Sequence, residues 1–567
     1  MPATSSPATI NRPSPLACEA CRRKHLKCDG VSPICGRCIT QSLACNYTPS
    51  RRGQSRRAHR RAASPPRPPL PPLPATPASL SNVPAHSQSC SLPASSGLTA
   101  STSWSLRATD RDRLLGLFYS HFFRAHPFLV PKAFYAAQQY PEFLDLTICL
   151  VGLHYAKPAP ADAASLREAV SLAMSGMDEP TVHRVQALIL YAIVLHSSQQ
   201  SEEAASCVAR AATIAATLGM NTPEFAVANA NANGSPLVAE SLRRTWWELH
   251  TVDVYTAAIN RRSTYETCSI ANYPLLPCSQ SLYESGQCYN QEPPTLQIFE
   301  DRVFSRNLYE NFSSMCYRIE AIRVVGRVLA VAANDDADPD NIQALDNALA
   351  SWEHHLPPIY ADVIGPSGEV DLMLFEARCF ISCASIFLHF PRSDLPATVP
   401  STSDIACARG YTPLTPTSRH HTIKAIAASK DLSNLATVPL PLEQHSPFFI
   451  CSLVLGCVVQ LAACSIHVHQ CGLDCLQQHR DRVVLLLGAL QRLGERWPLA
   501  HNAVQCLKAA AETVFAVHSR HENAPSEAFS HHYPTLGSDG SLANPLWFDL
   551  LFAEPVQAFS ATQTVDD

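Results

Sequence analysis

The sequence predicts a small metal-stabilised N-terminal module, a disordered linker rich in proline and serine, and then a large all-α domain. Three observations support this division. Six cysteines recur at matching intervals between Cys18 and Cys45. Residues 62–105 contain ten prolines, which no regular helix could accommodate. Residues 106–520 carry apolar side chains at helical spacing, while strand-like alternation is scarce.

Charge is distributed unevenly along the 567-residue chain. The formal net charge is −5, but residues 18–61 hold eleven Lys and Arg against two Asp and Glu. This stretch therefore carries +9 and the remainder −14. This uneven charge predicts that the basic residues 18–61 bind nucleic acid and that the acidic remainder of the chain does not. Residues 1–17 are rich in Ser, Pro and Thr without an apolar stretch, so we expect a disordered leader rather than a targeting signal.

Two cysteine triplets define the predicted module at residues 18–45. Each has the spacing Cys-x2-Cys-x6-Cys, and thiolates two residues apart can hold one metal ion from a single turn. Two tetrahedral zinc ions need eight ligand positions, which six cysteines supply if two sulfur atoms bridge both ions. A disulfide framework, which needs an oxidising compartment, and an unrelated zinc knuckle are the alternatives. The candidate ligands are Cys18, Cys21, Cys28, Cys35, Cys38 and Cys45.

This arrangement resembles the fungal binuclear zinc cluster, Zn2Cys6, a DNA-binding module that places a helix in the major groove. Pro33, between the two halves, also matches that family. The resemblance implies two Zn2+ ions per chain, with Cys18 and Cys35 as the bridging pair. It also implies that Cys21 and Cys28 complete one zinc site and that Cys38 and Cys45 complete the other.

Only the first half of the cysteine repeat is strongly basic, since the second half offers Arg37 alone. We therefore expect the first half to contact DNA, through a helix over residues 22–27. In the family that the module resembles, the residues matching Lys24 and His25 read a CGG triplet. Histidine can donate to guanine N7 or O6, but its charge depends on pH. The predicted DNA-binding residues are Arg22, Arg23, Lys24, His25 and Lys27.

The linker over residues 46–105 begins with a basic arm. This arm suits two compatible functions, a nuclear import signal and a flexible grip on DNA phosphates. No apolar heptad repeat follows it. The chain therefore either binds DNA as a monomer or forms a homodimer through the large domain. The arginines of the arm are Arg51, Arg52, Arg56, Arg57, Arg60 and Arg61.

The all-α region over residues 106–520 opens with an apolar helical face that includes Leu114, Phe118 and Phe122 and should end at Pro127. The uncharged stretch Phe448–Ile466 is as long as a membrane span. Ser452, Gln460 and Ser465 interrupt it and no basic flank orients it, so a buried helix is the better interpretation. Other helical runs are predicted near residues 185–195, 303–333, 371–390 and 478–518.

Within this region, Arg243-Arg244-Thr245-Trp246-Trp247 resembles the R-R-x-W-W motif of the fungal-specific transcription factor domain. Residues 209–220 and 493–500 are similar to other parts of that domain. We expect the tryptophans to fill the core and the arginines to pair with acids at helix ends. A ligand pocket between helices is an alternative role.

The C-terminal residues 521–567 contain no Lys or Arg. Five acids follow Tyr533, and a dense apolar cluster spans residues 546–552. Such a segment can stay solvated while its aromatic side chains dock into a coactivator groove. A final helix packed into the domain core is the alternative.

No motif of a known catalytic site appears in the chain. The absence of such motifs argues against an enzyme. The cysteine spacing, the basic charge and the resemblance to fungal Zn2Cys6 proteins together imply a nuclear, zinc-dependent, sequence-specific DNA-binding transcription factor of RNA polymerase II genes. Its expected partners are double-stranded DNA and coactivators, with no membrane. The resemblance implies control of one pathway, such as a secondary-metabolite gene cluster. A zinc- or redox-responsive regulator of stress or carbon and nitrogen metabolism genes is the alternative.

Overall fold

A computed structural model describes the chain in two compact units, Met1–Thr99 and Ala100–Asp567, which are considered separately. The predicted leader, basic arm and proline-rich linker lie outside the described residues, and so does the tail beyond Glu522. In the first unit the described residues are 18–24, 28–29, 34–41 and 43–45. In the second they are 107–522, apart from 177–178, 231–234, 271, 289–292, 305–311, 333–337, 397–404, 406, 408–413, 415–417 and 468–472.

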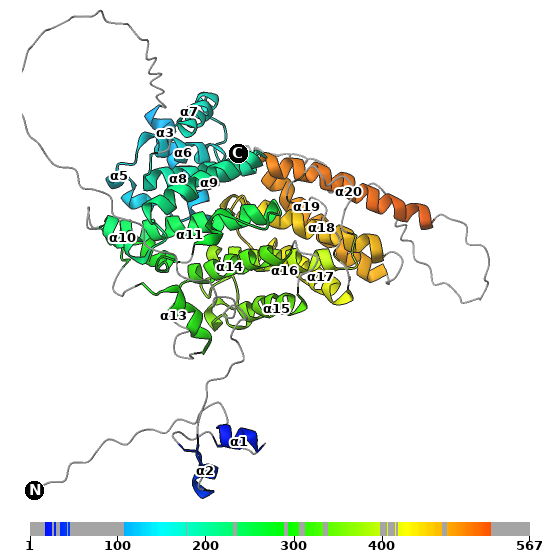
Figure 1. Cartoon of the computed structure of the whole chain (residues 1–567). Helices are drawn as coiled ribbons and strands as arrows, with labels where there is room; N and C mark the ends of the chain where they lie inside the picture. The colour runs from blue at the N-terminus through cyan, green and yellow to red at the C-terminus, as the bar shows by residue number, and fades with distance from the viewer. Residues whose placement is uncertain are drawn as a thin grey trace, which may run out of the picture. The chain divides into compact units, whose positions relative to one another are not determined.

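The first unit contains two short helices, α1 (Glu19–Arg23) and α2 (Gly36–Thr40), both labelled in Figure 1. Each begins one residue after a cysteine. The helix predicted over residues 22–27 is wrong in its described extent, because α1 ends at Arg23 and Lys24 lies in the following turn. The remainder of that prediction falls on residues 25–27, outside the described part.

The second unit is all-α in its described residues, as predicted, and its one extended pairing is a single bridge between Ile364 and Val370. Short helices connect the long ones: α4 (Phe123–Ala125), α5 (Tyr135–Gln138), α12 (Gln280–Glu284) and α13 (Leu296–Asp301). The long helices are α3 (Ala108–Leu117), α6 (Glu142–Leu153), α7 (Ala163–Ser175), α8 (Val182–Ser197), α9 (Ser201–Leu218), α10 (Pro223–Ala230), α11 (Pro236–Ile259), α14 (Ser314–Ala332), α15 (Pro339–His354), α16 (Leu372–His389), α17 (Arg419–Leu435), α18 (Phe449–His467), α19 (Leu473–Gly494) and α20 (Pro498–Glu522).

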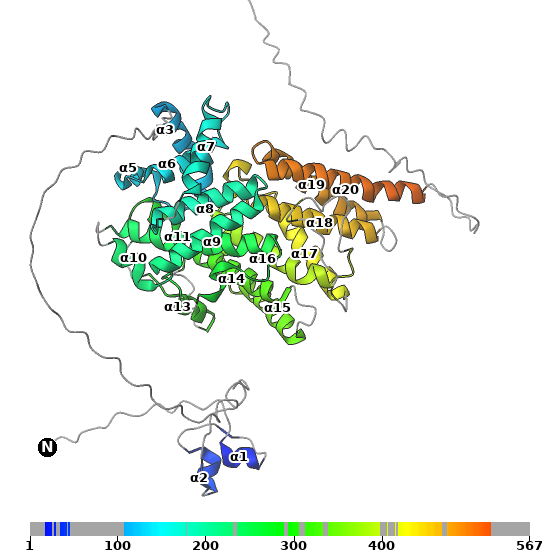
Figure 2. The same ribbon diagram turned by 45° about the horizontal axis from the view of Figure 1, so that its top comes forward.

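Helix α11 runs through the middle of this unit (Figures 1 and 2). It contacts α8, α9, α10 and α14, while α14 packs on α16 and α18 packs on α19. Nearly every residue of α11 is buried, as expected for a helix surrounded by other helices. Side chains of α11 are therefore placed to join segments that are distant in sequence.

The first predicted helical run is confirmed, but it contains a feature that the sequence did not reveal. Leu114, Phe118 and Phe122 are fully buried, and α4 ends before Pro127. Residues Phe118–Phe122 form a π-helical turn between α3 and α4. This wider turn keeps Phe118 against both Phe122 and Phe123, with ring centroids 5.5 and 6.5 Å apart.

The uncharged stretch forms α18 and is buried, as predicted. By length and composition alone, two helices could cross a membrane, Leu372–Arg392 and Phe449–Ile466, and the domain buries 83% and 89% of them. The polar side chain of Gln460 has partners inside the core. Its amide nitrogen donates to Ser429 Oγ at 2.6 Å, and its carbonyl oxygen lies 2.6 Å from His479 Nδ1. Helix α18 is therefore accounted for as a core helix with a satisfied buried amide.

Candidate metal centre and nucleic-acid interface

The six cysteines of the first unit converge. Their sulfur atoms form two groups of four, and within each group all sulfur atoms lie within 4.8 Å of one another. One group is Cys18, Cys21, Cys28 and Cys35, and the other is Cys18, Cys35, Cys38 and Cys45. Cys18 and Cys35 belong to both groups. They are the same two residues that the resemblance singled out as the bridging pair.

The sulfur spacing can be compared with the geometry of a zinc thiolate site. Four sulfur atoms about 2.3 Å from one zinc ion stand about 3.8 Å from each other at the corners of a tetrahedron. The Sγ atom of Cys18 lies 3.7 Å from those of Cys35 and Cys38, and the Sγ atoms of Cys21 and Cys35 are 3.8 Å apart. The donor set and its spacing therefore fit zinc.

Helix geometry orients the two shared sulfur atoms. Cys18 and Cys35 each stand immediately before a short helix, where amide groups have no helical acceptor. Cys18 Sγ accepts from Cys21 N at 3.5 Å, and Cys35 Sγ accepts from Cys38 N at 3.4 Å. The matching bonds give Cys18 and Cys35 equivalent positions in front of their helices. They also direct both sulfur atoms toward the centre of the cluster.

Ionisation of these thiols depends on their neighbours. The hydrogen bond from the Cys21 amide lowers the pKa of Cys18 to about 6. Burial raises the pKa of Cys21 to about 12 and raises that of Cys38 as well. Thiolates this close repel one another, and divalent cations remove that obstacle because a coordinating thiol is deprotonated outright.

The described part of the first unit has almost no core apart from these cysteines. Among its described residues, only Cys18, Cys21, Cys35 and Cys38 are buried hydrophobic residues. Ala20 and Leu43 pack against them and are only partly buried. So little burial cannot offset the conformational entropy of folding. We therefore expect folding of this unit to depend on the metal.

Two of the predicted DNA-binding residues have described side chains, and neither belongs to the cysteine groups. Arg23, at the end of α1, and Lys24, in the next turn, are both exposed. His25 and Lys27 lie outside the described residues, as do all six arginines of the arm. A residue that the sequence analysis missed is Asp29, whose Oδ2 accepts from Gly36 N at 2.8 Å. An acid seven residues before a helix start carries no recognisable local signal, so only the fold reveals this contact.

The R-R-T-W-W motif is structural in the second unit. Trp246 and Trp247 are fully buried on α11. Arg243 and Arg244 pair with Glu240 of the same helix, with N–O distances of 3.1 and 2.8 Å. The predicted pairing with acids is confirmed, but its expected position at helix ends is wrong. The partner lies one turn away on the same helix, so the pairs form in its buried interior.

A second set of buried polar and charged groups joins five segments around the middle of α11. Arg318 of α14 donates to Glu248 Oε2 at 3.0 Å and to Glu376 Oε2 of α16 at 2.5 Å. His126 Nδ1 lies 2.7 Å from Glu248 Oε1, and its Nε2 lies 2.9 Å from Ser446 Oγ. Burial acts to raise the pKa of Glu248, but Arg318 and His126 outweigh it, and the pKa falls to about 2.

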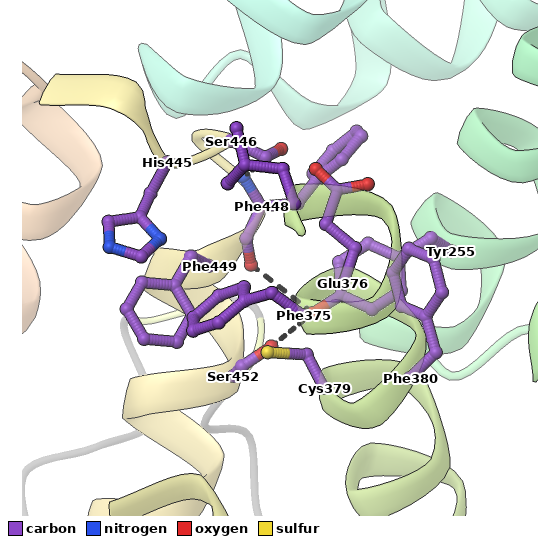
Figure 3. Close-up of a pocket in the computed structure, with 11 residues that line it drawn as sticks. Tyr255, Phe375, Glu376, Cys379, Phe380, His445, Ser446, Phe448, Phe449 and Ser452 are labelled. Carbon is purple, nitrogen blue, oxygen red and sulfur yellow. Dashed lines mark hydrogen bonds between the residues drawn. The ribbon is translucent and has the colours of Figure 1, made fainter. Parts of the chain in front are cut away.

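A small cavity lies beside these buried charges (Figure 3). It is lined mainly by aromatic side chains, with Tyr255 donating to Phe448 O at 3.2 Å and standing 3.0 Å from Ser452 Oγ. The space inside has room for about one water molecule. In this conformation the cavity does not accommodate a metabolite, so the alternative role of the motif region in ligand binding gains no support here.

Known protein families and relatives match this chain. The "Fungal Zn(2)-Cys(6) binuclear cluster domain" matches residues 16–54 and the "Fungal specific transcription factor domain" matches residues 115–354. The C6 finger domain transcription factor iacK of Pestalotiopsis fici is 30% identical over 573 aligned residues, covering 90% of this chain and 82% of its own. Transcription factor pgmR of Aspergillus terreus is 42% identical over 67 residues, 11% of this chain and 36% of its own. No solved structure matches the chain significantly.

Proposed function

Because the chain belongs to the fungal Zn2Cys6 transcription factors, which bind zinc and DNA and are not enzymes, we propose that it is a nuclear, pathway-specific regulator with two zinc ions per chain. The single observation that carries this proposal is the pair of four-sulfur groups that share Cys18 and Cys35. One shared pair lets six thiolates supply two tetrahedral sites.

In this proposal Cys21 and Cys28 complete one zinc site, and Cys38 and Cys45 complete the other. The two zinc ions are structural, because every coordination position is taken by a thiolate and none remains for a reacting water molecule. The role of the cysteines is to hold α1 and the basic residues after it in one orientation. Metal binding thereby couples folding of the module to recognition of DNA.

Base readout is assigned to Lys24 and His25, with Arg22, Arg23 and Lys27 holding the adjacent phosphates. The exposure of Arg23 and Lys24 supports this assignment, since both side chains are free of the small cysteine core. A lysine can contact guanine O6 and N7 in the major groove. The six arginines of residues 51–61 add attraction to any phosphate backbone and act as the nuclear import signal.

The target is proposed to be a CGG-type triplet, and the controlled genes are proposed to form one pathway, such as a secondary-metabolite gene cluster. The pathway proposal is supported by similarity along 90% of the chain to one C6 finger domain transcription factor. If it is correct, transcripts lost on deleting the gene should map to one biosynthetic locus. Residues 521–567 are proposed to bind coactivators.

The decisive experiment is an unbiased selection of DNA sequences bound by the full-length, zinc-loaded protein, followed by affinity measurements on the selected site. Lys24→Ala should weaken binding to that site by about 1–3 kcal/mol and leave binding to random DNA nearly unchanged. Replacing Arg51, Arg52, Arg56 and Arg57 by Ala should weaken binding to all sequences alike and flatten the salt dependence.

Equal losses on both DNAs for Lys24→Ala would contradict the assignment of base readout to this residue. The arrangement of triplets in the selected sequences also decides the oligomeric state on DNA. One triplet per site indicates a monomer, whereas two triplets at fixed spacing indicate a homodimer.

A further inference from the structure

A chain of hydrogen bonds runs from the core of the helical unit to a partly accessible thiol. Ser429 of α17 and Gln460 of α18 are fully buried, and His479 of α19 is 4% exposed. The chain ends at Cys475 of α19, which is half-buried and carries a thiol. His479 Nδ1 lies 2.6 Å from Gln460 Oε1, and His479 Nε2 lies 3.7 Å from Cys475 Sγ. Three helices therefore position one imidazole against one thiol.

The directions of these hydrogen bonds fix the tautomer of His479. Ser429 Oγ donates its only proton to Ile426 O at 2.8 Å, so it accepts from the Gln460 amide nitrogen at 2.6 Å. The oxygen of the Gln460 amide then faces His479 and accepts a proton from Nδ1. A neutral imidazole with its proton on Nδ1 presents an unprotonated Nε2 to Cys475. The buried partners of His479 thus present a base to the thiol.

Transfer of the thiol proton from Cys475 to His479 leaves both ring nitrogens with acceptors. The imidazolium donates from Nδ1 to Gln460 Oε1 and from Nε2 to the thiolate. Cys475 is also the third residue of α19, a helix of 22 residues, and the first turn of a long helix favours negative charge. A thiol beside a base that a third group orients is the arrangement of an activated nucleophile. The thiolate is the reactive form of cysteine.

We propose that Cys475 is a covalent modification site for soft carbon electrophiles of the α,β-unsaturated carbonyl class. His479 Nε2 takes the thiol proton, and the Cys475 sulfur forms a bond to the β-carbon of the electrophile. The π bond between the α- and β-carbons breaks, its electron pair moves to the enolate, and the imidazolium returns the proton to the α-carbon. One thiol and one electrophile give one thioether and no other product. Disulfide formation would need an oxidant and a second thiol, whereas this addition needs only a nucleophile and a base.

Cys268 of the same unit is the internal comparison. It is exposed in the short helix η4 (Glu266–Ser269), and among the described residues no histidine is hydrogen-bonded to it. If access alone set the rate of modification, Cys268 would react before the half-buried Cys475. If the imidazole activates the thiol, Cys475 reacts first. The order in which these two cysteines react therefore separates activation from exposure.

The test treats the full-length, zinc-loaded protein at about pH 7 with a limiting amount of N-ethylmaleimide, which is itself an α,β-unsaturated carbonyl compound. After quenching, the protein is denatured with a chelator, and deuterated N-ethylmaleimide labels the remaining thiols. The tryptic fragments 263–302 and 431–480 carry Cys268 and Cys475, and tandem mass spectrometry locates each label. We expect Cys475 to react on the order of tenfold faster than Cys268. Equal rates, or faster labelling of Cys268, would overturn the proposal whatever the variants show.

Matched variants identify the base. His479→Gln removes the imidazole and keeps a polar side chain next to Gln460, and it should lower the labelling rate of Cys475 below that of Cys268. His420→Gln changes an exposed histidine of α17 and should leave the order unchanged. Unchanged labelling of Cys475 in a His479→Gln protein with the helical circular dichroism of the unaltered chain would contradict the assigned role of His479.

Zinc content distinguishes this site from a metal site. A zinc ion beyond those of the cysteine module, with Cys475 protected from the label until a chelator removes it, would identify a metal site and overturn the proposal. These measurements do not depend on DNA binding, so the proposed function is tested separately.

Discussion

Replacing Arg318 by Met should destabilise the helical unit more than any comparable change at its surface. The guanidinium of Arg318 is 1% exposed and bonds two carboxylates, those of Glu248 and Glu376, which are 0% and 7% exposed. Methionine keeps most of the aliphatic volume and removes the charge. Among the described residues, Glu248 then keeps His126 as its side-chain partner, and Glu376 loses its ion-pair partner.

The size of the loss follows from leaving buried charge without a partner. Breaking a buried ion pair by removing one member typically costs about 3–5 kcal/mol. The control is Arg323→Met on the same helix, because Arg323 pairs with Glu300 where the two side chains are 27% and 42% exposed. A pair of that exposure contributes about 0–1 kcal/mol. Arg318→Met should therefore cost several kcal/mol more than Arg323→Met.

Urea unfolding of the full-length protein, followed by the helical circular dichroism signal, measures this difference directly. The zinc module adds little to the signal because its two described helices have five residues each. Equal unfolding midpoints for the two variants would refute the argument that Arg318 stabilises the interior by neutralising Glu248 and Glu376. Glu248→Gln combined with Arg318→Met should recover part of the lost unfolding free energy, because it removes one of the two buried carboxylates that Arg318 neutralised.

Three further predictions concern zinc binding, protein stability at low pH and the C-terminal residues. Cys38→Ser should abolish zinc-dependent folding of the first unit. Elemental analysis of the unaltered protein should find two zinc ions per chain. One zinc ion per chain would contradict an arrangement in which Cys18 and Cys35 are shared by two sites. Folding lowers the pKa of Glu248 from 4.5 to about 2. The ionised carboxylate therefore stabilises the fold by an amount on the order of 3 kcal/mol. This contribution is present above about pH 4.5 and is lost as the pH falls toward 2. The stability difference between the unaltered chain and Glu248→Gln should shrink across that window in urea titrations, and a constant difference would show that Glu248 is not the titrating group. Residues 533–567, fused to an unrelated DNA-binding domain, should activate a reporter gene, whereas a silent fusion together with a less stable truncated protein would favour a packed final helix.

The closely spaced cysteine pairs of the metal centre could be predicted from the sequence because their geometry is local, whereas the sharing of Cys18 and Cys35 was implied only by the family resemblance. Two residues between thiols span one turn, and that spacing alone places Cys18 with Cys21 and Cys35 with Cys38 around common centres. The sequence pattern was likewise sufficient to predict that α8 and α18 are buried helices. An apolar stripe or a long uncharged stretch indicates burial even when the helices that pack against it are unknown. The pairing of Arg243 and Arg244 with an acid was predictable for the same reason.

The contacts that join distant segments were decided by the tertiary structure alone. His126, Glu248, Arg318 and Glu376 meet only because α11, α14 and α16 pack together, and no spacing in the sequence relates them. The π-helical turn at Phe118–Phe122 depends on which aromatic side chains the surrounding core can accept. A sequence pattern records the preference of each segment for burial or solvent, whereas the partner that a buried charge or thiol meets depends on the packing of the whole domain.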